Sequence, residues 1–277
     1  MKIKMAKISK IFLIFLSLGM LFLLARHTSP SQEPWKLEKD LVQLASSTEE
    51  IVGENKENVD LEELKLETEK EGKNSEESPQ KKDFILLDVP FLAQSPLGEW
   101  DDQRQQDGCE EASSLIAMLW VQGEKEITKD EARKKILEIA QYELIKYQSY
   151  RDTSASSTLE RIIKGYFHYD EAEVKYDIAA ADIIAELEKG NLVIVPANGQ
   201  ALGNPHFTGE GPDRHMLVVI GYDFKTQEFI TQDPGTRQGK HYRYDEKVLF
   251  NAIRDYPTGD HLPITEKRKA MIVVSKS

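Results

Sequence analysis

The pattern of hydrophobic and polar positions divides the chain into three parts. Residues 11–25 form an apolar run that follows four lysines and is interrupted only by one serine and one glycine. Residues 28–82 are dominated by polar and charged positions. Residues 83–277 carry the periodic apolar patterns that helices and strands require. We therefore expect a targeting segment (1–27), a linker (28–82) and one folded domain (83–277).

The first half of the expected domain has the spacing of amphipathic helices. A helix is expected directly after Gly108, because apolar residues recur there three and four positions apart. Another is expected over residues 180–189, ending before Gly190, since glycine is favourable just after a helix. The spacing of a capping box marks two further helix starts, at Thr128 with Glu131 and at Ser157 with Glu160.

The second half has short runs rich in valine and isoleucine that are bounded by turn residues, a pattern typical of strands. These runs are 192–196, 216–222, 228–231 and 270–274. A similar run, 84–89, precedes the helices. Helices followed by strands indicate an α+β domain and not a βαβ alternation.

The start of the chain has the features of an export signal. Residues 1–27 carry a net charge of +5, and a basic start before an apolar run is typical of such signals. The apolar run has 15 residues, whereas a membrane-spanning helix needs about 17–25. No small-x-small cleavage site follows it. We expect either a single-pass signal anchor through residues 8–25 or a cleaved signal peptide, with the folded domain outside the membrane or secreted.

The linker is expected to be disordered. Residues 28–82 contain 15 acidic residues, 8 lysines and one aromatic residue. Such a composition buries too little apolar surface to offset the entropy of ordering the backbone. The linker is either a spacer that holds the domain away from the membrane or a tail with no specific role.

Composition excludes several classes of function. The net charge of −12 argues against nucleic-acid binding, which needs a positive surface. A single cysteine excludes an internal disulfide framework and a cysteine-rich zinc site. The chain also lacks a His-Glu-x-x-His motif, and its six histidines show no metal-ligand spacing. We expect no metal, no cofactor and a monomer.

The single cysteine, Cys109, is a candidate nucleophile. It lies in the expected first turn of a helix, where the helix dipole and free N–H groups stabilise a thiolate. Gly108 before it allows substrate or backbone to approach closely. The alternative is a buried apolar cysteine without chemistry. Glu110 and Glu111 complicate the assignment, since negative charge beside a thiol raises its pKa.

A thiol nucleophile needs a base and a group that orients the base. His215 directly precedes an expected strand and is the first candidate, with His206 in reserve. Asp233 ends the next expected strand and meets His215 if the two strands pair. The alternatives are an ordinary surface histidine and a turn-starting aspartate.

An oxyanion donor is the fourth component of such a site. The candidates are the backbone N–H of Cys109 and four glutamine side chains, Gln94, Gln103, Gln105 and Gln106.

These motifs together resemble the peptidase C39-like family of papain-type cysteine proteases. The matching segments are Val89-Pro90-Phe91-x-x-Gln94, Gly108-Cys109-Glu110-Glu111-Ala112-Ser113, His215 before the apolar run to Gly221-Tyr222-Asp223, and Asp233-Pro234. The resemblance spans most of residues 84–275. It implies a papain-like fold, with a helical N-terminal half whose nucleophile helix packs on an antiparallel sheet.

The resemblance also implies roles for single residues. Cys109 would be the nucleophile, His215 the base, Asp233 the orienting residue and Gln94 the oxyanion donor. In family members with a shorter spacing the glutamine stands six residues before the cysteine, which is the position of Gln103.

Two functions follow from these residues. The first is a thiol hydrolase that cleaves a peptide or amide bond in a polypeptide or cell-wall substrate through a thioester. The second is a catalytically inactive, membrane-tethered binding domain that uses the same cleft. The expected ligand contacts are Gly108, Trp100, Trp120 and the loop from Asn198 to His206.

Overall fold

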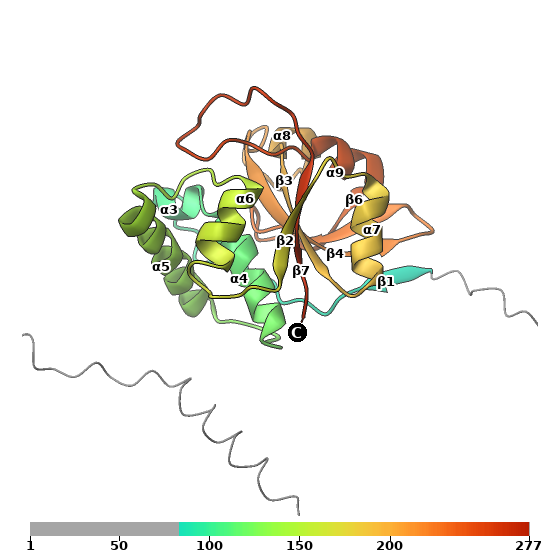
Figure 1. Ribbon diagram of the computed structural model, residues 1–277, viewed down its shortest axis with the longest axis horizontal. Helices are drawn as coiled ribbons and strands as arrows, with labels where there is room; N and C mark the ends of the chain where they lie inside the picture. Colours follow the sequence, from blue (N-terminus) through green and yellow to red (C-terminus); the bar gives the residue numbers. More distant parts are fainter. Residues whose placement is uncertain (1–82, 277) are drawn as a thin grey trace, which may run out of the picture. The chain divides into compact units, whose positions relative to one another are not determined.

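An antiparallel sheet forms the centre of the computed structural model, which describes residues 83–276 (Figure 1). The strand order is β2-β7-β3-β4-β5-β6, and β1 pairs with the end of β4. The strands are β1 (Phe84–Leu86), β2 (Ala172–Tyr176), β3 (Leu192–Ala197), β4 (His215–Asp223), β5 (Glu228–Gln232), β6 (Lys240–Asp245) and β7 (Ala270–Val274).

Helices cover both faces of this sheet. Figure 1 shows α4, α5 and α6 on one side and α7 and α9 on the other. The helices are α3 (Gln103–Gln106), α4 (Cys109–Val121), α5 (Lys129–Tyr147), α6 (Ala155–Ser157), the π-helical turn η1 (Thr158–Ile163), α7 (Ala180–Glu188), α8 (Gly199–Leu202) and α9 (Glu246–Ala252).

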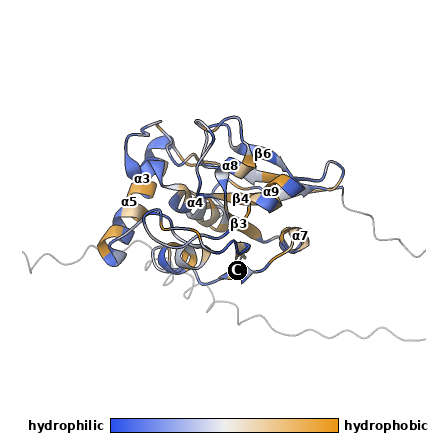
Figure 2. Ribbon diagram, turned by 90° about the horizontal axis from the view of Figure 1, so that it is seen from above, coloured by the Kyte–Doolittle hydropathy of each residue, from blue (hydrophilic) through white to orange (hydrophobic). Residues whose placement is uncertain are grey.

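The alternation of side chains along β4 supplies both hydrophobic cores. Met216, Val218 and Ile220 pack on the face that carries α4, whereas Leu217 and Val219 pack on the opposite face. Because successive strand residues point to opposite faces, a strand buried on both sides reads as a continuous apolar run. Figure 2 shows the hydrophobic residues gathered around the central strands β3 and β4.

Helix α4 is almost fully buried, which fixes the position of its first residue. Every residue from Cys109 to Trp120 is buried, and the Ser113 hydroxyl donates to the carbonyl of Met216 at 3.0 Å. This hydrogen bond ties the first turns of α4 to the start of β4. The two ends that matter for the site, the start of α4 and the start of β4, are therefore held together by the core.

The α+β prediction is confirmed. The helix that begins at Cys109 packs on an antiparallel sheet, which is the papain-like arrangement implied by the resemblance. The capping box of Thr128 and Glu131 opens α5, and Gly190 follows α7 with a left-handed φ of 84°. The third expected helix begins earlier than predicted, because Ser154, not Ser157, is the residue that caps it.

The sequence patterns missed five elements, namely β2, β6, α3, α8 and α9. Strands β2 and β6 are the two edges of the sheet and are largely polar, so they lack the apolar run that marked the other strands. The three helices have only four to seven residues each.

The expected targeting segment and linker lie outside the described residues. Within residues 83–276, no helix is long and apolar enough to cross a membrane. The expected anchor through residues 8–25 and the linker 28–82 stay predictions.

Gly221→Ala should lower the free energy of unfolding by about 1–3 kcal/mol, the usual cost of overpacking. A Cβ at this position would lie 2.3 Å from the backbone oxygen of Ile85, where β1 pairs antiparallel with the end of β4. Urea denaturation of the full chain measures the change. Thr226→Ala in the exposed turn after β4 is the control, and a Gly221→Ala effect no larger than the control would contradict the close packing of β1.

Candidate active site

Cys109 is the first residue of α4, as the sequence predicted, and it is only 6% exposed. Gly108 precedes it at the N-cap, where a Cβ would lie 2.5 Å from the backbone oxygen of Arg104. A glycine is therefore required for the sharp turn between α3 and α4. Burial is the largest influence on the pKa of Cys109 and raises it, whereas the neighbouring backbone N–H of Met216 acts to lower it. This places the sulfur beside the residue that follows His215.

His215 and Asp233 meet in the interior. His215 Nε2 and Asp233 Oδ1 are 2.8 Å apart, and both side chains are at most 1% exposed. The contact results from the antiparallel pairing of β4 with β5, in which Val218 lies opposite Gln232. Since His215 begins β4 and Asp233 directly follows β5, the pairing brings both side chains to the same end of the two strands. The Nε2 contact leaves Nδ1 as the nitrogen for any proton exchange with a thiol.

Two further donors hold the Asp233 carboxylate. The Tyr244 hydroxyl donates to Oδ2 at 2.6 Å, and the Gly235 N–H donates to Oδ1 at 2.9 Å. Burial alone would raise the pKa of Asp233, but the charge of His215 and these hydrogen bonds outweigh it, so the pKa lies below its usual value. Asn204 Nδ2 in turn donates to the Tyr244 oxygen at 2.8 Å. Asp233 is thus held ionised beside the imidazole.

Tyr244 and Asn204 are site residues that the sequence analysis missed. Tyr244 lies on the polar edge strand β6, which was not predicted. Without that strand, the sequence could not indicate that the Tyr244 side chain points towards Asp233. Asn204 lies in the loop from Asn198 to His206, which was predicted as a ligand contact and not as a partner of the Asp233 network.

The His215 ring packs directly against Gly235, where a larger residue would clash with it. A Cβ there would lie 2.8 Å from His215 Cε1 and 3.2 Å from Asp233 Oδ1. Phe207 packs edge-on against the imidazole with ring centroids 5.3 Å apart. The sequence Asp233-Pro234-Gly235 therefore combines the carboxylate that contacts the imidazole with the small residue that the imidazole requires.

The Cys109 thiol donates its hydrogen bond to a carboxylate. Its Sγ lies 3.0 Å from Glu110 Oε2. No hydrogen bond within residues 83–276 joins the sulfur to His215. Burial, followed by the charge and hydrogen bond of Glu110, raises the pKa of Cys109 well above its usual value. The thiol is therefore protonated at neutral pH in this conformation.

The candidate oxyanion donors are occupied or exposed. Gln94 Nε2 donates to the carbonyls of Gln105 and Gln106 at 3.0 and 2.7 Å, so both of its N–H groups are used. Gln103 is exposed and accepts a hydrogen bond from Arg151, and the buried Gln105 side chain donates to Glu99. The backbone N–H of Cys109 lies in the first turn of α4, where it has no intrahelical acceptor, and is the remaining candidate donor.

The model of the Peptidase_C39 like family matches residues 86–257, which is more than half of the chain. The chain belongs to the Peptidase_C39 like family. A comparison with curated proteins gives no match. Among solved structures, a protein of Bacillus anthracis described as a candidate C39-like peptidase is 16% identical, with 71% of this chain and all of that chain covered and a TM-score of 0.44.

This C39-like domain differs from the sequence-based expectation at the ligand contacts. Trp120 is only 4% exposed and packs in the core, so it is not available to a ligand. Asn198 caps α8, with its side-chain oxygen accepting from the N–H groups of Gln200 and Ala201, and its role as a ligand contact stays a prediction. Trp100 is 38% exposed and stays a prediction, as does the contact at Gly108. His206 is exposed, in contrast to His215.

Among residues 83–276, no group of three or more His, Cys, Asp or Glu side chains could hold a metal ion.

Two more buried acids lie near the start of α4. Glu111 and Glu143 are both 0% exposed, and within residues 83–276 their carboxyl oxygens have no hydrogen-bond partner. Burial raises the pKa of both. The charge of Glu143 and then that of Glu110 act in the same direction on Glu111, and burial together with the charge of Glu110 brings the pKa of Glu143 to about 9. The helical face beneath Cys109 therefore favours protonated acids and opposes further negative charge.

Glu143→Gln should raise the free energy of unfolding at pH 8 by on the order of 2 kcal/mol. Burial raises the Glu143 pKa from 4.5 to about 9, so between these values the folded chain holds a proton that the unfolded chain releases. The stability that this carboxyl contributes is present below pH 4.5 and is lost as the pH rises through 9. Glutamine cannot ionise and removes this dependence.

Urea denaturation at several pH values between 5 and 9 measures this effect. The control is Glu138→Gln on the exposed face of the same helix, which should change stability by less than about 0.5 kcal/mol at every pH. An unchanged pH slope in Glu143→Gln would contradict the assignment of Glu143 as a buried, protonated acid.

Proposed function

We propose that this protein is a thiol hydrolase that cleaves a peptide or amide bond, with Cys109 as nucleophile, His215 as base and Asp233 as the residue that orients the base. The main support is the buried 2.8 Å contact between His215 and Asp233, at the end of the sheet where Met216 lies beside the Cys109 sulfur. Membership of the Peptidase_C39 like family supports the same class of chemistry.

The first half of the proposed reaction forms a thioester. His215 Nδ1 takes the proton from the Cys109 sulfur, and the thiolate attacks the carbonyl carbon of the substrate. The negative charge that develops on the carbonyl oxygen is stabilised by the Cys109 N–H and the helix dipole of α4. When the tetrahedral intermediate collapses, the C–N bond breaks and His215 returns the proton to the leaving amine.

The second half releases the acyl group. His215 takes a proton from a water molecule, which attacks the thioester carbonyl. The C–S bond then breaks, and the sulfur regains a proton from His215, so the enzyme returns to its starting state. Throughout, Asp233 keeps Nε2 protonated and stabilises the positive imidazolium, as the hydrogen bonds from Tyr244 and Gly235 keep the carboxylate ionised.

An inactive binding domain is the second candidate function. It is favoured by the hydrogen bond of the thiol to Glu110, by the raised pKa of Cys109 and by the occupied amide of Gln94. For catalysis the Cys109 thiol must break its hydrogen bond to Glu110 and form one to His215. Hydrolysis that depends on Cys109 separates the two candidates.

We also propose an extracytoplasmic location, either tethered through residues 8–25 or secreted, and a monomeric domain. The basic and apolar pattern of residues 1–27 supports export. Exposed polypeptides or cell-wall cross-bridges are then the available substrates.

Cys109→Ala should abolish hydrolysis of a quenched-fluorescence peptide library and shift the thermal midpoint by only a few degrees. His215→Gln should also abolish turnover. Glutamine is chosen because it can still donate to Asp233, whereas removal of the whole side chain would leave a buried charge without a partner.

His206→Gln is the matched control, because His206 is exposed and should leave turnover unchanged. The base would be misassigned if His206→Gln reduced turnover more than His215→Gln. A large stability loss in Cys109→Ala would instead mark the thiol as a packing residue.

Tyr244→Phe should lower kcat about tenfold with little change in KM, since it removes one hydrogen bond to a charged group, worth about 1.5–3 kcal/mol. Tyr244 acts through Asp233. Loss of its hydrogen bond raises the pKa of the carboxylate, so the acidic limb of the pH–rate profile should also shift to higher pH. Tyr242→Phe on the same strand is the control. Equal effects of both variants on kcat would mean that Tyr244 does not position the carboxylate.

A further inference from the structure

Glu110 is held in place by three hydrogen-bond donors. Cys109 Sγ donates to Oε2, while the Tyr256 hydroxyl and the Thr153 N–H donate to Oε1 at 2.9 and 3.1 Å. The side chain is only 1% exposed. A buried carboxyl needs such donors, and here one of them is the candidate nucleophile itself.

The contacts of Glu110 lead to the protein surface through a loop. Tyr256 belongs to a segment of residues 255–262 between α9 and β7, which we term the strap. Figure 1 shows this dark red loop reaching towards the helices beside the sheet, above α6. The strap therefore touches Glu110 directly through Tyr256 and indirectly through the segment that carries Thr153.

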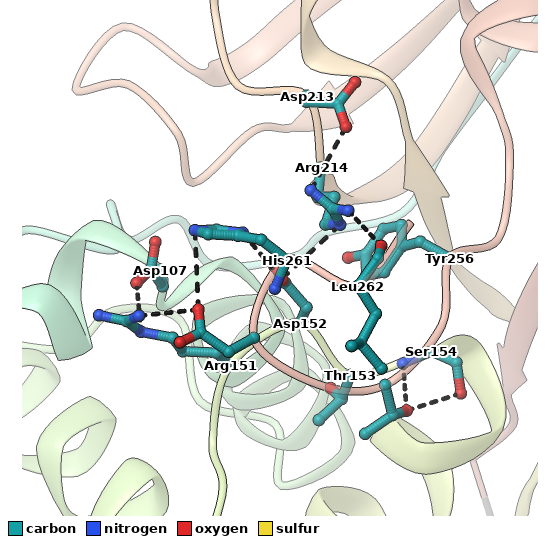
Figure 3. A network of polar contacts seen from close by, with 12 residues as sticks. Asp107, Arg151, Asp152, Thr153, Ser154, Asp213, Arg214, Tyr256, His261 and Leu262 are labelled. Atoms are coloured by element: carbon teal, nitrogen blue, oxygen red, sulfur yellow. Dashed lines mark hydrogen bonds and ion pairs between the residues drawn. The ribbon is translucent and has the colours of Figure 1, made fainter. Parts of the chain in front are cut away.

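The indirect connection is made by Asp152, the residue before Thr153. The His261 N–H donates to Asp152 Oδ2 at 2.6 Å, and His261 Nδ1 lies 2.9 Å from the same oxygen. The Gly259 N–H donates to the Asp152 carbonyl at 3.0 Å. Figure 3 shows the strap residues His261 and Leu262 grouped with Asp152 and Arg214. The strap thus fixes the backbone that supplies the Thr153 N–H to Glu110.

The strap also connects the two halves of the candidate site. On the helical side, Arg151 pairs with Asp260 of the strap at 2.8 Å and with Asp107, two residues before Cys109, at 3.0 Å. On the sheet side, Arg214, the residue before His215, donates to the carbonyl of Leu262 at 2.5 Å. Movement of the strap would therefore be transmitted to both sides of the site.

We propose that Glu110 restrains the Cys109 thiol in a resting position away from His215, and that the strap holds Glu110 in this position. The proposal rests on the proposed function. When a polypeptide substrate displaces the strap, Glu110 loses the donors at Oε1, the thiol is released and the sulfur turns to His215 Nδ1. The restraint limits reaction of the thiol in the absence of substrate.

The surroundings of Glu110 are consistent with this role. The titratable groups that face it are Cys109 and Glu111 on α4, Glu143 on α5, Asp152 from the loop before α6 and Tyr256 from the strap. Burial, the largest influence, raises the pKa of Glu110 to about 7; the charge of Asp152 acts in the same direction, and the hydrogen bonds from Cys109 and Tyr256 oppose it. The carboxyl thus gains or loses its charge near neutral pH, where its effect on the thiol changes most.

The test is the rate at which iodoacetamide alkylates Cys109 in the full-length protein between pH 6 and pH 9. Glu110→Gln removes the negative charge and keeps the shape, so alkylation at pH 8 should be at least about tenfold faster, the change expected when a thiol pKa falls by one unit. Glu111→Gln is the matched control, because it is buried one position along the same helix and does not bond to the sulfur. A Glu110→Gln rate equal to or below the wild-type rate would overturn the restraint.

A surface variant tests the strap separately. His261 is 58% exposed, so His261→Ala should fold, and it should accelerate alkylation several-fold by loosening Asp152 and Thr153. An unchanged rate in His261→Ala would overturn the role of the strap, including in the case that Glu110→Gln does not fold.

The same assay distinguishes failure of this inference from failure of the proposed function. If Glu110→Gln accelerates alkylation but His215→Gln leaves its pH profile unchanged, the restraint holds and His215 is not the base. If His215→Gln changes the profile but Glu110→Gln does not, the base assignment holds and the restraint is wrong.

Discussion

The buried hydrogen bond between His215 and Asp233 is the interaction on which the candidate site depends. It exists because β4 and β5 pair antiparallel, which brings the first residue of one strand next to the residue that follows the other. Tyr244 and Gly235 then fix the carboxylate from the neighbouring strand and turn. The burial of α4 against β4 brings the sulfur of Cys109 to the same end of the sheet.

The environment of the thiol opposes its ionisation. The start of a helix favours an anion, but burial and the carboxyl of Glu110 raise the pKa of Cys109. Glu111 and Glu143 lie in the same dry region, with raised pKa values of their own. In the proposed mechanism the thiol stays protonated until the site rearranges, which limits unwanted reaction of the thiol and slows the first step. The hydrogen bonds from Thr153 and Tyr256 to Glu110 are the contacts by which we propose that the strap controls this step.

The sequence predicted the elements that carry strong local signals. The capping box at Thr128, the glycine after α7 and the apolar runs of β3, β4, β5 and β7 all correspond to observed elements. The edge strand β6 was missed because its exposed positions are polar, and with it Tyr244 was missed. The hydrogen bond from Cys109 to Glu110 could not be predicted either. Sequence position shows that the two residues are neighbours, but only the packing of Tyr256, from 146 residues away, shows why the carboxylate is held against the sulfur.

The most direct test of the central claim is to look for the covalent intermediate. The full-length protein is mixed with an active peptide substrate from the library and quenched in acid within milliseconds to seconds, and its mass is then measured intact and after proteolysis. The account predicts a transient acyl group on Cys109 that is absent in Cys109→Ala and forms far more slowly in His215→Gln. Hydrolysis that proceeds without such an adduct, or an adduct on another residue, would contradict it.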